Sequence, residues 1–278
     1  MLIDTHVHLI DRQRLTYPWI ARVPALNQDA TYTDYLRQCR QLGITHSLHM
    51  EVDVAESDIE NETLYIKELM DRPDSQLVGA IASCRPEQDT FQAYFERQKL
   101  RPWIKGFRRI LHEVDDELSR NPLFRSNLKL LSNTSFVFDV CARADQLPIA
   151  IELVDSCPDV QFVLDHCGVP NVKSAELDPW REQMSRIAER PNVAGKISGV
   201  IAYGNGLDWT LEDIRPFVEH TFEAFGPDRV VWGSDSPVCT LGGSLASWVA
   251  ATRALFMEAS ASERAAFYYE NARRIWSL

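Results

Sequence analysis

Short apolar runs, separated by longer amphipathic stretches, recur along the whole chain. Eight of these runs cover residues 1–7, 44–50, 76–82, 103–110, 135–141, 161–167, 192–198 and 229–235. Several are rich in β-branched or aromatic residues, as buried strands commonly are. The run at 103–110 is the weakest, because Arg108 and Arg109 interrupt it. The pattern predicts eight strands.

The stretches between the runs carry helix signals. Ser57 with Glu60 matches a capping box, and Asn121 before Pro122 matches an N-cap followed by proline in the first turn. Strands that alternate with helices favour a parallel sheet of βαβ units. Eight units of about 35 residues suit a (β/α)8 TIM barrel. We therefore expect one α/β domain over residues 1–278, since no linker or repeat divides the chain. A doubly wound open sheet is the alternative, but the glycine-rich turn that usually follows its first strand is absent.

Charge and composition restrict the partners. The chain has 40 acidic and 29 basic residues, a net charge of −11, and this field repels nucleic acid but leaves small-molecule substrates open. No apolar run approaches the ~18 residues of a membrane span, and the first residues do not resemble a signal peptide. The six cysteines form no C-x-x-C pair, which indicates reduced thiols. We expect a cytoplasmic protein without membrane contact, while monomer and homo-oligomer both stay open.

Polar residues at the ends of the apolar runs are the candidates for chemistry. His6 and His8 lie two apart on the first run, so their side chains share one face of a strand. His166 and Asp235 end the sixth and eighth runs, and barrel enzymes place their active sites at these strand ends. Barrel closure brings the first and eighth strands together, so Asp235 is expected beside the two N-terminal histidines. Each residue alone can be explained by a structural role, such as a helix cap or a core histidine. The occurrence of all four at strand ends is what indicates an active site.

Two designs fit three histidines and one carboxylate at a barrel mouth. In the first, His6, His8, His166 and Asp235 bind one divalent metal, with zinc the favoured ion. In the second, no metal is present, the histidines donate hydrogen bonds to a substrate carbonyl, and Asp235 removes a proton from water. Both designs stay open at this point.

Five further residues are candidates for substrate binding. Lys196 and Arg108 stand in apolar strands, where a charge is costly unless it has a partner or a task. Either could bind a carboxylate, or could extend outward between helices instead. Trp19, in an aromatic segment after the first strand, could wall a pocket and stack on a sugar-like ring, or could form a local apolar lid. Glu51 and His112, which follow the second and fourth runs, could reach the barrel mouth.

Taken together, these motifs resemble the amidohydrolase superfamily. Within it, the chain is similar to the sugar lactonase group that includes L-fucono-lactonase, L-rhamnono-lactonase and 2-pyrone-4,6-dicarboxylate lactonase. The resemblance spans nearly the whole chain and rests on IDTHVHL, YPW, KGFRRIL, FVLDHCGVP, NVAGKISGV, FGPDRVVWGSDSPVC and NARRIW. The YPW and GSDSPVC segments are more specific to this group than the D-x-H-x-H pattern, which many amidohydrolases share.

The resemblance implies a (β/α)8 barrel that hydrolyses the lactone ring of a sugar acid or a related carboxylated lactone. It implies that Asp235 activates water while His6, His8 and His166 polarise the carbonyl, directly or through one metal. The fifth run, SFVFDVC, lacks the histidine of a binuclear site, which weakens a two-metal interpretation.

The departures from the group lie at Ser236, Arg109 and His112, where the group commonly has tryptophan, histidine and glutamine. These departures leave the substrate open. The alternatives are a metal-dependent non-oxidative decarboxylase, or another amidohydrolase acting on a small aromatic or cyclic acid. A catalytically inactive binding protein is a third hypothesis.

Overall fold

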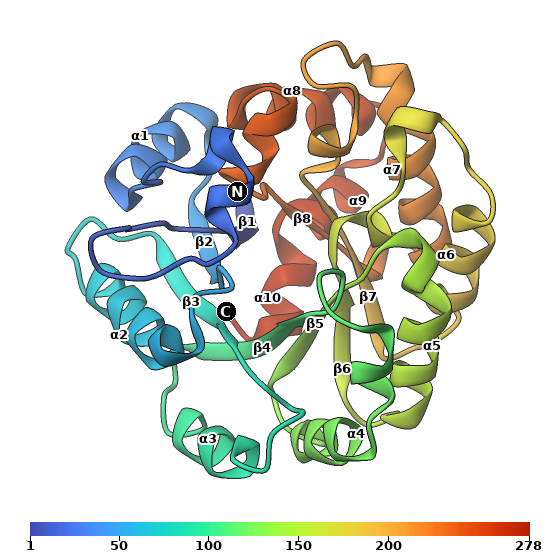
Figure 1. Cartoon of the computed structure of the whole chain (residues 1–278). Helices are drawn as coiled ribbons and strands as arrows, with labels where there is room; N and C mark the ends of the chain where they lie inside the picture. The colour runs from blue at the N-terminus through green and yellow to red at the C-terminus, as the bar shows by residue number, and fades with distance from the viewer.

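Eight parallel strands form one sheet in the order β1 to β8, and helices surround it in a ring (Figure 1). The computed structural model describes residues 1–278. The strands are β1 (Ile3–Val7), β2 (His46–Met50), β3 (Leu77–Ser83), β4 (Ile104–Ile110), β5 (Val137–Cys141), β6 (Gln161–Leu164), β7 (Val193–Ser198) and β8 (Val230–Gly233). All eight strands predicted from the apolar runs are confirmed.

At least one α-helix follows every strand. The helices are α1 (Tyr32–Leu42), α2 (Ile59–Met70), α3 (Phe91–Gln98), α4 (Pro122–Leu128), α5 (Leu147–Ser156), α6 (Trp180–Ala188), α7 (Leu211–Phe225), α8 (Leu245–Leu255), α9 (Ala261–Ala265) and α10 (Asn271–Trp276). Asn121 caps α4 as predicted, because its side chain accepts a hydrogen bond from the Leu123 amide. The predicted capping box at Ser57 is wrong: a 3-10 turn (Glu56–Asp58) precedes α2, which has no side-chain cap. None of the helices combines the length and apolar character that a membrane crossing requires.

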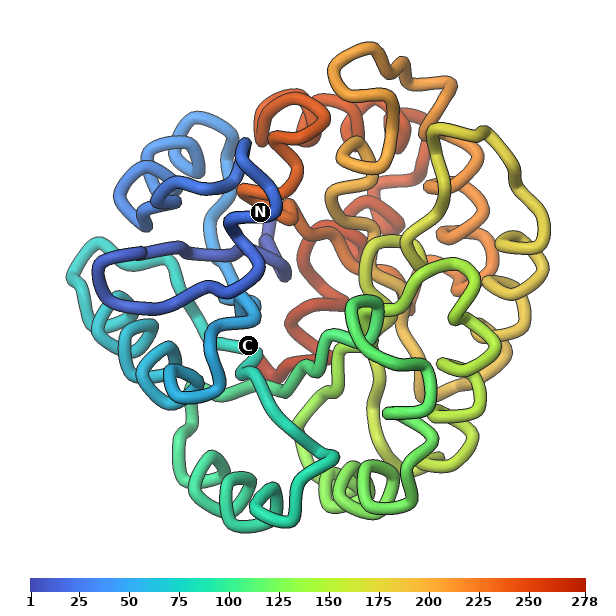
Figure 2. The backbone as a smooth tube through the Cα atoms, viewed as in Figure 1, coloured from blue at the N-terminus to red at the C-terminus, as the bar shows by residue number.

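The sheet closes into a barrel between its first and last strands. The Asp235 amide donates to the His6 carbonyl and the His8 amide donates to the Ser236 carbonyl, both at 2.8 Å. Figure 2 shows the same closure as a single circuit of the backbone, which brings the blue N-terminal unit beside the red C-terminal unit. The fold is therefore the (β/α)8 barrel that the sequence predicts.

An apolar cluster fills the N-terminal half of the barrel interior. Ile3, Val137 and Val231 belong to it, and Ala272 and Trp276 of α10 pack against it. The polar side chains lie further along the strands, towards their C-terminal ends. The interior is thus divided into a dry lower layer and a charged upper layer that supports the site.

An irregularity in β1 turns its two histidines towards the interior. Ile3 belongs to the interior cluster, whereas Asp4 accepts a hydrogen bond from Tyr35 on α1, outside the barrel. Strict alternation from Ile3 would place residue 6 outside. The register between β1 and β2 shifts between Asp4 and Val7, and such shifts re-aim side chains near active sites. His6 and His8 therefore both face inward.

Candidate active site

A cavity of about 400 Å³ opens where the strands end. Six of the nine predicted site residues line it: His8, Trp19, Arg108, His112, His166 and Asp235. The other three, His6, Glu51 and Lys196, are buried and do not line its wall. The strand-end positions predicted from the sequence thus converge on one site in two layers, a wall and a support beneath it.

Three donor atoms converge at the floor of this cavity. His6 Nε2 lies 3.2 Å from His8 Nε2, and Asp235 Oδ1 lies 3.7 Å from the first nitrogen and 3.3 Å from the second. His8 Nδ1 lies 3.0 Å from the Met50 carbonyl, which only accepts, so the proton stands on Nδ1 and Nε2 carries a lone pair.

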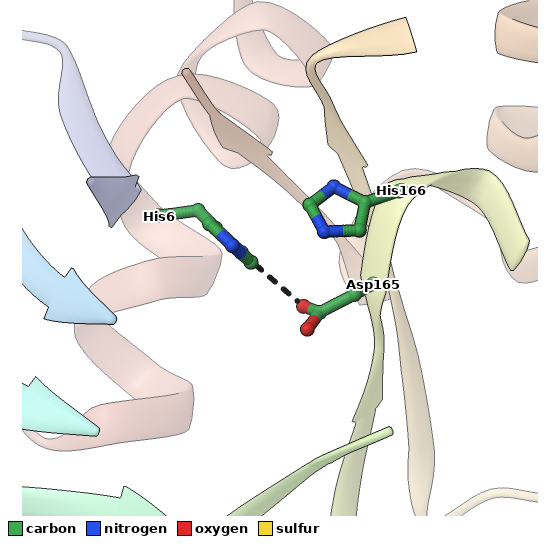
Figure 3. Close-up of side chains that lie close together, drawn as sticks. All are labelled: His6, Asp165 and His166. Carbon is green, nitrogen blue, oxygen red and sulfur yellow. Dashed lines mark ion pairs between the residues drawn. The ribbon is translucent and has the colours of Figure 1, made fainter. Parts of the chain in front are cut away.

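The second nitrogen of His6 faces a carboxylate. His6 Nδ1 lies 3.4 Å from Asp165 Oδ1, and Figure 3 shows the two side chains pointing towards each other, with His166 alongside. Burial holds the pKa of His6 well below its usual value, although Asp165 opposes this shift. A histidine that donates Nδ1–H to a carboxylate presents Nε2 as a lone pair, which is the usual arrangement of a metal ligand.

The spacing of this group fits a divalent metal ion. Two ligand atoms of a tetrahedral zinc ion, each about 2.0–2.1 Å from it, are about 3.4 Å apart. The distances among His6, His8 and Asp235 span 3.2–3.7 Å, and all three residues are buried. His166 does not belong to this group; it forms a second potential metal-binding group with His6 and Asp165.

His166 is held by strand β7 and lies against the other histidines. Its Nδ1 lies 2.9 Å from Ser198 Oγ and 3.7 Å from Asp235 Oδ2, and its ring centroid lies 4.5 Å from that of His6. Its backbone has φ of 54°, which turns the side chain into the barrel mouth directly after β6. Burial lowers the pKa of His166, so the ring is neutral near pH 7.

The backbone around Asp235 leaves one carboxylate oxygen free. Asp235 has φ of 56°, a region that aspartate tolerates better than most residues. Its carbonyl accepts a hydrogen bond from the Cys239 amide, and Gly199 packs against its side chain. Oδ1 faces the histidines, whereas the buried Oδ2 has no hydrogen-bond partner. The carboxylate thus keeps an acceptor for a further group.

Arg108 lines the cavity but its guanidinium is already engaged. Nε donates to Glu51 Oε1 at 2.6 Å and Nη2 donates to the Glu51 carbonyl at 2.7 Å. Nη1 faces His6 Nε2 at 3.3 Å and Asp165 Oδ2 at 3.5 Å. Burial alone would raise the pKa of Glu51, but the charge of Arg108 lowers it. Glu51 therefore acts as the partner of Arg108, and the Arg108 guanidinium is not free to bind a substrate carboxylate.

The three remaining predicted residues differ in depth. Trp19 Nε1 donates to the Val52 carbonyl at 2.8 Å, which fixes the indole in the cavity wall. His112, 29 % exposed, stands at the rim with Nδ1 3.2 Å from Cys141 Sγ, and burial lowers its pKa to about 4. Lys196 is 0 % exposed and lies below the site, so the structure does not bring it to the cavity.

Sequence reasoning missed several residues of the site. Asp165 contacts His6 from below, Asp139 pairs with Lys196 beneath the site, and Tyr203 and Cys141 line the cavity. A usable signal existed for the two aspartates, because each is a charge within or at the end of an apolar strand, as Lys196 is. No sequence signal marks Tyr203, whose place depends on the turn after β7.

The sequence matches the Amidohydrolase family over residues 3–278, and the chain belongs to that family. Membership of this family identifies the protein as a hydrolase. An L-fucono-1,5-lactonase from Burkholderia multivorans is 27 % identical over 99 % of this chain and 96 % of its own length. The amidohydrolase family that the motifs predicted is thus confirmed, and the chain is similar to this lactonase.

Two solved structures extend the comparison. An amidohydrolase from Burkholderia multivorans, solved with bound zinc, is 25 % identical, with a TM-score of 0.89 over 100 % of this chain and 99 % of its own. A 5-carboxyvanillate decarboxylase from Sphingomonas paucimobilis is 15 % identical, with a TM-score of 0.68 over 100 % of this chain and 99 % of its own. The second likeness concerns the fold alone.

Proposed function

We propose that this protein opens the ring of a small neutral lactone, such as the 1,5-lactone of a sugar acid, by hydrolysis. The convergence of His6, His8 and Asp235 at the cavity floor carries this proposal, because it places a base beside ligand atoms spaced for a divalent ion that would polarise a carbonyl oxygen. The lactonase relative supports the reaction type.

The free oxygen of Asp235 accounts for the proton transfers. Oδ2 accepts a proton from water as the water oxygen attacks the lactone carbonyl carbon. The tetrahedral intermediate then collapses, the ring carbon–oxygen bond breaks, and Asp235 returns the proton to the leaving alkoxide. The product is one hydroxy acid, and no group is oxidised or reduced. His166, neutral and 3.7 Å from Oδ2, is placed to hold the water or the carbonyl oxygen.

A metal fits the same site. We propose zinc as the ion and His6, His8 and Asp235 as the residues that would hold it; when bound, it supplies a Lewis acid for the carbonyl oxygen. Asp165 would orient His6 from behind, and the Met50 carbonyl would orient His8. The assignment of Oδ1 to the ligand group and Oδ2 to proton transfer lets Asp235 serve both roles.

The charges around the cavity favour a neutral substrate over a carboxylated one. Arg108 is engaged by Glu51, and the other lining cation, Arg22, is exposed and lies 3.6 Å from Glu113. Asp53 and Glu113 add negative charge to the wall. A substrate carboxylate would find no free buried cationic side chain here. The same argument disfavours a decarboxylase, whose aromatic acid substrate carries a carboxylate.

A hydrolysis screen tests the proposal. Neutral sugar-acid 1,4- and 1,5-lactones, a pyrone dicarboxylate and aromatic acids are incubated with the enzyme, and proton release and carbon dioxide are measured. We expect ring opening of neutral lactones, loss of activity after chelation and recovery with zinc. Carbon dioxide release from aromatic acids, or preference for the dicarboxylate, would contradict the proposed function. Chelator-insensitive lactone hydrolysis would contradict only the metal.

A further inference from the structure

Below the cavity, the barrel encloses a lysine between two carboxylates. Lys196 Nζ of β7 forms an ion pair with Asp165 Oδ1 at 2.8 Å and donates a hydrogen bond to Asp139 Oδ1 on β5. All three side chains are fully buried. The Lys196 ammonium also lies 5.5 Å from the centre of the Trp276 ring, which belongs to the apolar cluster below.

Packing alone does not account for a lysine at this position. A buried ion pair adds little net stability compared with apolar side chains of similar volume, because both charges lose their hydration. The lower layer of the same barrel is filled by apolar side chains, such as Ile81, Val163 and Val231. The polar group is therefore best explained by what it contacts above.

The contact above is His6, one of the three converging residues of the site. Asp165 Oδ1 lies 3.4 Å from His6 Nδ1 and is the same oxygen that Lys196 contacts, and Lys196 Nζ itself also lies 3.4 Å from His6 Nδ1. Arg108 Nη1 lies 3.5 Å from the other oxygen. The Asp165 carboxylate is thus held by a cation at each oxygen, and its rotation away from His6 would break both contacts.

We propose that Lys196 is a positioning residue, which fixes the Asp165 carboxylate against His6 Nδ1 and so keeps His6 Nε2 directed at His8 Nε2 and Asp235. Asp139 has a different task. It touches Lys196 but not the histidine, and one of its oxygens has no partner, so it balances the charge of the lysine. This inference rests on the proposed function only through zinc binding by His6.

Zinc affinity, measured without substrate, is the readout. The metal-free protein and its variants are titrated with zinc in competition with a chromophoric chelator, and folding is followed by circular dichroism. Lys196→Met should weaken zinc binding by about 10–100-fold, the usual effect of removing a partner behind a ligand. Asp139→Asn should stay close to wild type, because Lys196 then pairs with Asp165 alone. Thr252→Val, which removes a buried hydrogen bond to Trp232 outside the site, is the matched control.

The design keeps the possible failures apart. If Lys196→Met does not fold, the double variant Lys196→Met/Asp139→Asn removes the unpaired charge, and the same loss of affinity is expected. A folded variant without Lys196 that binds zinc like wild type would overturn the inference. A wild-type protein that takes up no zinc would overturn it together with the proposed metal, whereas zinc binding without lactone hydrolysis would contradict the proposed reaction alone.

Discussion

Replacing Gly199 by alanine should displace Asp235 and lower activity far more than it lowers stability. Gly199 follows β7 with φ of +58°, and a methyl group added there would lie 2.5 Å from both Cβ and Oδ2 of Asp235. Ordinary contacts of this kind begin near 3.4 Å. The aspartate must therefore move by about 1 Å from its present place beside the histidines, and misplacement on this scale costs about 10²-fold in rate.

A second glycine separates this collision from the backbone penalty. Gly206 has φ of +60°, and an added methyl group would meet no atom within 4 Å. Alanine in this region costs about 1–2 kcal/mol at either position. Gly206→Ala should therefore lose that stability but keep its turnover, whereas Gly199→Ala should lose both.

The assay is the kcat for lactone opening, measured beside urea unfolding of each variant at the same temperature. The ratio of the two kcat values isolates the displacement of Asp235, because the two substitutions share the same backbone strain. Equal kcat values for the two variants would refute the placement of Asp235 against Gly199, or its role in the reaction.

Two further predictions follow from the buried charges. Burial lowers the pKa of His112 from 6.5 to about 4, so between these pH values the unfolded chain binds more protons than the folded one, and stability falls as the pH drops through this window. His112→Gln should therefore make the urea midpoint fall less steeply with decreasing pH. An unchanged dependence of the midpoint on pH would contradict the lowered pKa of His112. Glu51→Gln removes the nearer buried counter-charge of Arg108 and leaves only Asp165, at 3.5 Å, so it should destabilise the fold by up to about 3–5 kcal/mol, measured by urea unfolding. A loss no larger than that of an exposed Glu→Gln substitution, such as Glu212→Gln, would argue against the ion pair.

The architecture could be predicted from the sequence because it depends on local patterns. Apolar runs set the strands, and residues two apart on one run share a face, which correctly paired His6 with His8. The closure of eight strands then placed Asp235 beside them. The actual inward direction of the histidines needed the register shift in β1, which depends on pairing with β2 and leaves no mark in the sequence.

The partners of the charged residues could not be predicted in the same way. The sequence around Arg108 does not indicate its partner, because the contact with Glu51 depends on two strands that the alternation pattern alone does not bring to one height. Lys196 stands in an apolar strand like a pocket residue, yet its position along the strand sets it below the cavity, between Asp139 and Asp165. How deep a side chain lies in a barrel depends on the stagger of neighbouring strands, and the spacing of residues along the sequence does not reveal that stagger.

The most direct test compares wild type with Asp235→Asn on neutral sugar-acid 1,5-lactones. Asparagine tolerates the positive φ of this position, so folding is preserved while the base is lost. Proton release is followed with a pH indicator, and spontaneous hydrolysis is subtracted. We predict a kcat/KM above about 10⁴ M⁻¹ s⁻¹ for at least one lactone, with kcat lowered about 10²–10⁴-fold in the variant. Wild-type turnover by Asp235→Asn, or no catalysed opening of any lactone, would contradict the account.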